Sequence, residues 1–265
     1  MQIPKGGVFF FDSGIGGLTV LAECARKRID LPFYYYGDNV NAPYGNYSPE
    51  RIYSLVQQAI ENYLYLKPSA IVLACNTVTA VCVDRLRREY SIPIIGTEPA
   101  VLPASKKGGE IYILTTRATY ACARFQALCK KTEKAYPNAT FTFFPQQRLA
   151  GEIEKHLLDK KFDFTPFFPP GTPDSVVLGC THYVYLKGQI KDFYGCDIFD
   201  GNAGVAGRLF SLFSTKGREE RPLATLLQSR RQFSPIFFLG GALEYNKRVY
   251  EQMFAKTSVF DNKSG

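Results

Sequence analysis

The chain has 265 residues, 46% of them apolar and 21% charged, with a formal net charge of +8, which suits a globular protein of one large domain or two ordinary ones. Its basic residues are scattered among acids, and it has no nucleic-acid-binding motif, membrane-length apolar run or secretion signal, which excludes nucleic-acid-binding and membrane proteins and predicts a cytoplasmic one. Seven cysteines without a Cys-x-x-Cys pair and only two histidines argue against a disulfide framework or a zinc site.

The first part of the chain alternates between strand-like and helix-like segments. Short apolar runs predict strands at 8–11, 33–36, 71–74 and 92–95, and helical apolar spacing predicts helices at 18–27, 49–66 and 78–90. Strands and helices in alternation typically form a mostly parallel sheet with helices on both faces. We therefore expect an α/β fold.

The same pattern restarts in the later part of the chain. The apolar run 111–114 is followed by Thr115-Thr116 and a helix, much as 9–11 is followed by Asp12-Ser13. This similarity predicts two related halves. We interpret the Phe/Pro-rich stretch 160–173 as an irregular surface loop.

The chain ends in an isolated strand–helix unit. An apolar run at 235–239 is followed by a helix that extends to about residue 255, and the polar stretch 215–222 before it suits a linker. One strand and one helix are too few to fold alone, so we expect them to complete the first sheet. We divide the chain into a first domain of residues 1–98 plus 214–265 and a second of residues 99–213.

Two apolar segments, one in each half, resemble each other, and each ends in a cysteine. The first reads Ala-Ile-Val-Leu-Ala-Cys-Asn-Thr at 70–77, and the second reads Ser-Val-Val-Leu-Gly-Cys-Thr-His at 175–182. Because ligands bind at the carboxyl ends of parallel strands, matched units place Cys75 and Cys180 on opposite sides of a shared cleft. Two opposed acid–base groups can remove a proton from one face of a carbon and return it to the other.

Cys75 lies close to the start of a predicted helix. The free amide groups and the dipole at a helix start favour thiolate over thiol, so we expect the pKa of Cys75 to be lowered enough for it to act as a base near neutral pH. The remaining cysteines lie in helical stretches or loose loops, and we interpret them as inert packing residues: Cys24, Cys82, Cys122, Cys129 and Cys196.

Polar residues flank both cysteine units. The segment Asp12–Gly17 lacks the spacing of a dinucleotide loop and the lysine of a P-loop, and Asp12 suits a substrate ammonium group or the orientation of an acid–base group. His182 follows Cys180 by two positions and can support its proton chemistry or bind a distal carboxylate. Other loop residues can bind carboxylates through amides and hydroxyls: Tyr44, Gly45, Asn76, Thr77 and Thr181.

Five groups of residues, in order along the chain, together indicate a family. They are Asp-Ser-Gly-Ile-Gly-Gly-Leu-Thr-Val at 12–20, Tyr-Gly-Asp at 36–38 with Pro-Tyr-Gly at 43–45, Ala-Cys-Asn-Thr at 74–77, Glu-Pro-Ala at 98–100 and Gly-Cys-Thr-His-Tyr at 179–183. In this combination the chain resembles the bacterial glutamate racemases. Related aspartate racemases share the paired cysteines but usually carry Glu at the position of His182, which favours glutamate.

The resemblance implies two pseudo-symmetric α/β domains with the active site in the cleft between them. It implies cofactor-independent interconversion of L- and D-glutamate, which supplies D-glutamate for peptidoglycan and hence for cell-wall biogenesis and cell shape. Cys75 would take the α-proton of D-glutamate and Cys180 that of L-glutamate, with Asp12 and His182 assisting the thiols. The implied substrate-binding residues are Asp12, Ser13, Tyr44, Gly45, Asn76, Thr77, Thr181 and His182. We expect no metal and no partner beyond the small-molecule substrate; a homodimer is left open.

One stretch departs from the family pattern. Phe144-Pro145 stands where the family often has Cys-Pro, Gln146–Gly151 replaces an apolar run, and Val184 replaces a common Pro. Glu152 aligns with the family's acid, and its role is left open. We interpret the neighbouring His156 as a surface residue in a charged helical stretch that also contains Glu152, Glu154 and Lys155.

Other functions remain open alongside glutamate racemisation. One is a racemase for another substrate, such as aspartate or a hydantoin, against which His182 argues. Another is a non-catalytic dicarboxylate-binding protein, against which the intact cysteine pair argues. A redox role ranks lower, because thiols that flank a substrate stand too far apart to form a disulfide.

Overall fold

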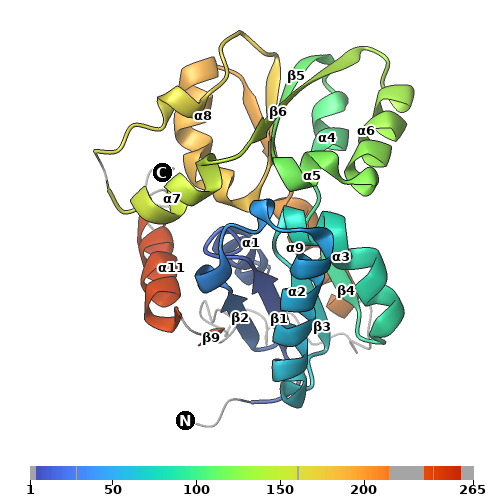
Figure 1. The fold of residues 1–265 in the computed structure, drawn as a ribbon, viewed down its shortest axis with the longest axis vertical. Coiled ribbons are helices and arrows are strands. Elements are labelled where there is room, and N and C mark those ends of the chain that lie inside the picture. The colour runs from blue at the N-terminus through green and yellow to red at the C-terminus, as the bar shows by residue number, and fades with distance from the viewer. Residues whose placement is uncertain (1–3, 28, 160, 215–235, 241, 258–265) are drawn as a thin grey trace, which may run out of the picture.

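The computed structural model describes residues 4–27, 29–159, 161–214, 236–240 and 242–257 (Figure 1). Its strands are β1 (Val8–Asp12), β2 (Phe33–Gly37), β3 (Ala70–Leu73), β4 (Ile94–Gly96), β5 (Gly109–Thr116), β6 (Ala139–Gln146), β7 (Ser175–Gly179), β8 (Asp197–Asp200) and β9 (Ile236–Leu239). Its α-helices are α1 (Leu18–Ala25), α2 (Pro49–Tyr63), α3 (Asn76–Glu89), α4 (Val101–Ser105), α5 (Arg117–Ala121), α6 (Ala123–Ala135), α7 (Leu149–His156), α8 (Lys187–Tyr194), α9 (Asn202–Ser214) and α11 (Leu243–Thr257).

Five parallel strands form the first sheet, in the order β4-β3-β1-β2-β9. Every residue of the central strand β1 is buried, because alternate side chains enter different cores. Val8 and Phe10 join the cluster on one face, and Phe9 and Phe11 join the cluster on the other. This is the pattern of a parallel sheet that helices cover on both faces. Strand β9, from the end of the chain, forms an edge beside β2.

Four parallel strands form the second sheet, in the order β6-β5-β7-β8. The α/β class expected from the sequence is thereby confirmed. The segment 160–173 is irregular except for a short 3-10 helix at Thr165–Phe167. It is more than a surface loop, because Phe164 and Phe168 are buried in the core of this sheet. The expected linker 215–222 lies outside the described residues.

Helix α9 joins the two halves. Its residues Val205, Ala206 and Leu209 are buried in the core cluster of the first sheet, where α9 lies against α1. The sequence division placed this helix in the second domain. The division into residues 1–98 plus 214–265 and 99–213 stays a proposal, and the packing favours a second boundary ahead of α9.

The carboxyl ends of the two sheets face each other. Figure 1 shows one sheet above the other, with the loops after their strands in between. A hydrogen bond of 2.9 Å joins the hydroxyl of Thr77, just after β3, to that of Thr116, at the end of β5. Residues that follow strands in either half therefore meet in one place. Within the described part of the chain, no helix combines the length and apolar character needed to cross a bilayer.

Candidate active site

Asp12 is the last residue of β1 and is completely buried. Its Oδ2 accepts a hydrogen bond of 2.9 Å from the backbone N–H of Gly14, whereas its Oδ1 has no hydrogen-bond partner among the described residues. Gly17 makes room for this carboxylate, since a Cβ at Gly17 would lie 2.6 Å from the Cβ of Asp12. Burial raises the pKa of Asp12 above its ordinary value, although nearby His182 opposes the rise.

Cys75 follows β3 and is the N-cap residue of α3, which begins at Asn76 rather than at 78. Only 5% of its surface is exposed, and its Sγ lies 3.5 Å from the Ser13 hydroxyl. Burial and the Asp12 charge raise the pKa of Cys75 to about 12. The expectation of a lowered pKa is therefore wrong for the ligand-free site: the Ser13 hydroxyl and the helix-start amide of Val78 do lower the pKa, but burial outweighs them.

Cys180 follows β7 in the second half, and 6% of its surface is exposed. Its Sγ lies 3.8 Å from Nδ1 of His182. Nε2 of the same imidazole lies 2.6 Å from Oε1 of Glu154 on α7. Cys180, His182 and Glu154 thus form a continuous hydrogen-bonded chain from the sulfur to a carboxylate.

His182 and Glu154 form a buried ion pair. Burial lowers the pKa of His182, but hydrogen bonds to Cys180 and Glu154, together with the Glu154 charge, outweigh it and raise that pKa well above its ordinary value. Burial likewise opposes ionisation of Glu154, and the His182 contact lowers the pKa of Glu154 despite it. The two shifts agree in direction on an imidazolium beside a carboxylate, with the sulfur of Cys180 on the other side of the ring.

The two sulfurs share one site. The Ser13 hydroxyl of the β1–α1 loop lies 3.5 Å from the sulfur of Cys75, and His182, which the same loop approaches, lies 3.8 Å from the sulfur of Cys180. The β1–α1 loop lies between them. A Cβ at Gly16 would come 2.5 Å from Nδ1 of His182 and 2.6 Å from the Thr181 hydroxyl. Because only glycine permits this approach, the loop of the first half fits against the Cys180 side of the second.

The residues predicted to bind carboxylates lie around the two thiols, and they differ in whether their side chains already have hydrogen-bond partners. Thr77 bonds to the hydroxyls of Thr116 and Thr119, and the Thr181 hydroxyl is buried with no partner among the described residues. Gly45 lies over Thr116, at 3.5 Å from an added Cβ. The side chains of the other two are occupied within the protein: the Tyr44 hydroxyl donates to Asp38, and the Asn76 amide donates to the Thr97 carbonyl.

Glu154 and Thr116 are site residues that sequence reasoning missed. The sequence places Glu154 in a charged helical stretch with no assigned role, and the resemblance aligns the family's acid with Glu152. In the structure Glu152 lies near Lys155 and His156 instead, with N–O separations of 3.8 and 3.6 Å. Helical spacing was the available signal for Glu154, since it shares a helix face with buried Ala150 and half-buried Leu157. For Thr116, the signal was its place after an apolar run that matches the one before Asp12.

His156 stacks on Phe162, with ring centroids 4.0 Å apart. The structure offers no cluster of three or more His, Cys, Asp or Glu side chains that could hold a metal ion, within the residues it describes. The chemistry available at the site is therefore that of two thiols, an imidazolium–carboxylate pair, a buried aspartate and several hydroxyls.

Comparison with known proteins places these features in a family. Residues 18–209 match the family model described as Asp/Glu/Hydantoin racemase. A glutamate racemase from Clostridium perfringens (strain SM101 / Type A) is 38% identical over 219 residues, which cover 78% of this chain and 83% of the relative. One from Clostridium botulinum (strain Kyoto / Type A2) is 37% identical over 220 residues, which cover 79% and 84%.

Solved structures agree along nearly the whole chain. Escherichia coli glutamate racemase, in complex with L-glutamate and the activator UDP-MurNAc-ala, is 26% identical with a TM-score of 0.71, and the match covers 89% of this chain and 99% of that one. A glutamate racemase isoform from Bacillus anthracis is also 26% identical, with a TM-score of 0.72 and 94% of each chain covered.

Proposed function

The chain belongs to the family of Asp/Glu/hydantoin racemases, and we propose that it interconverts L- and D-glutamate by a two-base reaction at Cys75 and Cys180. The observation that carries the proposal is that one thiol from each half borders the β1–α1 loop: Cys75 contacts Ser13, and Cys180 contacts His182, against which Gly16 fits. Glutamate as the substrate is inferred from the relatives. They are glutamate racemases, and the match covers most of their length.

The reaction balances with no further reactant. A thiolate at Cys180 takes the α-proton of L-glutamate and becomes a thiol, which leaves carbanion character on the α-carbon. The Cys75 thiol then donates its proton to the opposite face and becomes a thiolate, which gives D-glutamate. The reverse reaction uses the same steps in the opposite order. The assignment of Cys180 to the L-enantiomer rests on the family resemblance.

The polar residues suit the two charged ends of an amino acid. The free Oδ1 of buried Asp12 can accept the substrate ammonium, whose positive charge would offset the effect of Asp12 on the pKa of Cys75. The hydroxyls of Thr77, Thr116 and Thr181 can donate to carboxylates and stabilise negative charge that spreads from the α-carbon. Ser13, Tyr44, Gly45 and Asn76 are further candidates for substrate binding.

Substrate access requires the two halves to move apart. Both thiols are almost fully buried, and the loop between them fits tightly against His182 and Thr181. A closed site excludes water and strengthens the electrostatic effects on which proton abstraction from an α-carbon depends. We assign closure of the halves around glutamate to the catalytic cycle, and supply of D-glutamate for peptidoglycan to the enzyme's role.

The decisive experiment is to incubate the purified protein with L-glutamate in heavy water, without added cofactor, and to separate the enantiomers. The proposal predicts an equal mixture of enantiomers, with deuterium at the α-carbon of the product. A panel of other amino acids and a hydantoin runs in parallel. Faster exchange on another substrate would replace glutamate, and binding of glutamate without any exchange would show a dicarboxylate-binding protein instead.

A further inference from the structure

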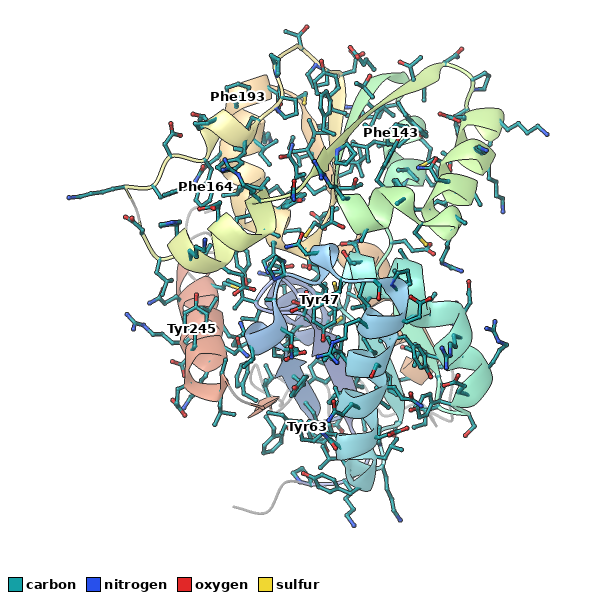
Figure 2. All side chains as sticks on the ribbon, viewed as in Figure 1. Tyr47, Tyr63, Phe143, Phe164, Phe193 and Tyr245 are labelled. Atoms are coloured by element: carbon teal, nitrogen blue, oxygen red, sulfur yellow. The ribbon has the colours of Figure 1, made fainter. Side chains whose placement is uncertain are left out.

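The first turn of α11 reaches the candidate active site, although it lies beyond the residues 18–209 that the family model matches. Figure 1 shows α11 directly beside α7, the helix that carries Glu154, and Figure 2 shows Tyr245 on the face of α11 near that junction. Two adjacent residues of α11, Tyr245 and Asn246, contact the surroundings of Glu154 in different ways.

Tyr245 acts on the backbone of α7. Its hydroxyl donates a hydrogen bond of 3.1 Å to the main-chain carbonyl of Glu154. Helix α7 ends at His156, so this carbonyl lies in the last turn, where the helix itself supplies no donor. The bond from Tyr245 therefore satisfies an otherwise open carbonyl and fixes the residue whose side chain holds His182.

Asn246 is completely buried, yet neither polar atom of its side chain has a hydrogen-bond partner among the described residues. It points toward Gly37 at the end of β2. A Cβ added at Gly37 would lie 2.9 Å from Nδ2 of Asn246, 3.0 Å from Oδ1 of Asn39 and 2.5 Å from the carbonyl of Gly14. The absence of a side chain at Gly37 thus lets two amides and a carbonyl of the active-site loop converge.

Asn39 connects this cluster to the carboxylate. Its Nδ2 donates to Oε2 of Glu154 at 3.4 Å, while its Oδ1 is buried without a partner. The other oxygen, Oε1, accepts from the backbone N–H of Ile15 at 2.8 Å and contacts His182. The contact with Glu154 keeps Nδ2 of Asn39 turned toward the carboxylate, because the flipped amide would present an oxygen to it. Oδ1 of Asn39 then faces the space at Gly37 that Nδ2 of Asn246 also faces.

We propose that Tyr245 and Asn246 are positioning residues for the Cys180 side of the site: Tyr245 fixes the main chain of Glu154, and Asn246 closes the space at Gly37 beside the Asn39 amide that holds its carboxylate. The C-terminal helix thereby holds His182 against Cys180. The expected effect on kcat rests on the proposed function. The position of His182 against Cys180 does not, and the reactivity of Cys180 measures it without any turnover.

A purely structural role fits Asn246 poorly. A buried polar group without a partner destabilises the folded state, and an apolar residue of similar size would pack against the same core without that cost. Val249, one turn further along the same helix, does so. The buried amide of Asn246 instead faces polar groups of the active-site loops around Gly37, which points to a role beyond packing.

The test uses the full chain with Tyr245→Phe and Asn246→Leu, and with Tyr112→Phe as the matched control. Tyr112 also donates its hydroxyl to a main-chain carbonyl, that of Pro170 at 3.2 Å, and this bond takes no part in the hydrogen-bonded chain from Cys180 through His182 to Glu154. Iodoacetamide labels each protein under native conditions, and peptide mass spectrometry follows Cys180 and Cys75 separately. We expect Cys180 labelling to slow about fivefold in Tyr245→Phe, as loss of one hydrogen bond allows. We expect it to slow in Asn246→Leu as well, with Cys75 labelling unchanged in both variants.

Two further readouts separate positioning from folding. Asn246→Leu should melt at the same or a higher temperature than the parent while its kcat falls about fivefold, and Tyr112→Phe should keep the parent's labelling ratio and kcat. An unchanged ratio of Cys180 to Cys75 labelling in both α11 variants would overturn the inference. So would a lower melting temperature of Asn246→Leu with normal kcat. If the parent racemises nothing, the proposed function fails, yet the labelling ratio still decides this inference.

Discussion

Cys75 and Cys180 end corresponding strands in the two halves, yet their neighbours differ in charge. Cys75 lies beside the neutral Ser13 hydroxyl and near the buried Asp12 carboxylate. Cys180 lies beside the imidazole of His182, whose pKa is raised by the contacts with Cys180 and Glu154 despite burial. A negative neighbour favours the thiol and a positive neighbour favours the thiolate. The comparison teaches that similar strand–cysteine units carry opposite electrostatics.

This opposition suits the proposed reaction. A two-base racemase needs one sulfur without its proton and the other with it before each turnover, and two identical environments would not select between them. In the ligand-free site burial and the Asp12 charge favour the thiol at Cys75, whereas Cys180 has the imidazole of His182 as its neighbour. Substrate binding then adjusts the balance, because an ammonium group beside Asp12 reduces the negative charge near Cys75.

The largest expected effect comes from removing either thiol. We expect Cys75→Ala and Cys180→Ala each to lower the racemisation rate by about 10³-fold or more, since each sulfur is an obligatory acid or base. The equilibrium constant between enantiomers is one, so kcat/KM must fall equally in both directions. Chiral chromatography from each pure enantiomer measures this.

Cys196→Ala is the control for the thiol variants. Cys196 lies at the edge of the second core and should leave turnover unchanged. Near-normal activity in either active-site variant would mean that at most one thiol is essential. The two-base mechanism would then be wrong.

A smaller effect is expected on the Cys180 side alone. Glu154→Gln removes the carboxylate that raises the pKa of His182, so the imidazolium should deprotonate at lower pH. We expect kcat/KM to fall by about 10²-fold and the alkaline limb of its pH profile to move to lower pH.

Glu152→Gln is the matched control, because Glu152 precedes Glu154 by two residues and contacts Lys155 and His156 instead. It should retain the activity and pH profile of the parent. If Glu152→Gln, and not Glu154→Gln, lost activity, the ion pair seen in the structure would not be the working one.

The smallest expected effect concerns the reactivity of Cys75. Asp12→Asn removes a negative charge that, after burial, raises the pKa of Cys75. The thiolate of Cys75 should therefore form at lower pH, with iodoacetamide labelling faster by on the order of fivefold at a fixed alkaline pH. Labelling followed against pH by mass spectrometry shows the shift. A Cys75 profile that does not move in Asp12→Asn would mean that burial alone sets its reactivity.

Much of the fold could be predicted from the sequence, for a physical reason. Buried parallel strands are short continuous apolar runs, and runs such as Val8–Phe11 and Ala70–Leu73 became strands with every residue buried. The repeated strand–cysteine unit likewise indicated that Cys75 and Cys180 follow strands at a common edge. The packing of α9 on the first sheet was missed, because the apolar face of a helix does not indicate which of two hydrophobic cores it packs against.

The site was predictable where residues follow strands and not where they come from elsewhere. Asp12, Ser13, Cys75 and Cys180 were located by local pattern alone. Glu154 was missed because a charged residue in a charged helix is ordinary in sequence, and only the packing of α7 against the β1–α1 loop buries it. Tyr245 and Asn246 were missed because they come from a helix far along the chain.

By itself the sequence determined the α/β class, the pair of thiols and their place at strand ends, because strand burial and strand termination are local properties of the chain. Tertiary structure alone decided how those thiols differ. The charge next to each sulfur comes from distant segments, Asp12 for Cys75 and Glu154 through His182 for Cys180. Burial then makes those charges decisive, since the pKa of a thiol depends on how much water and which charges surround it.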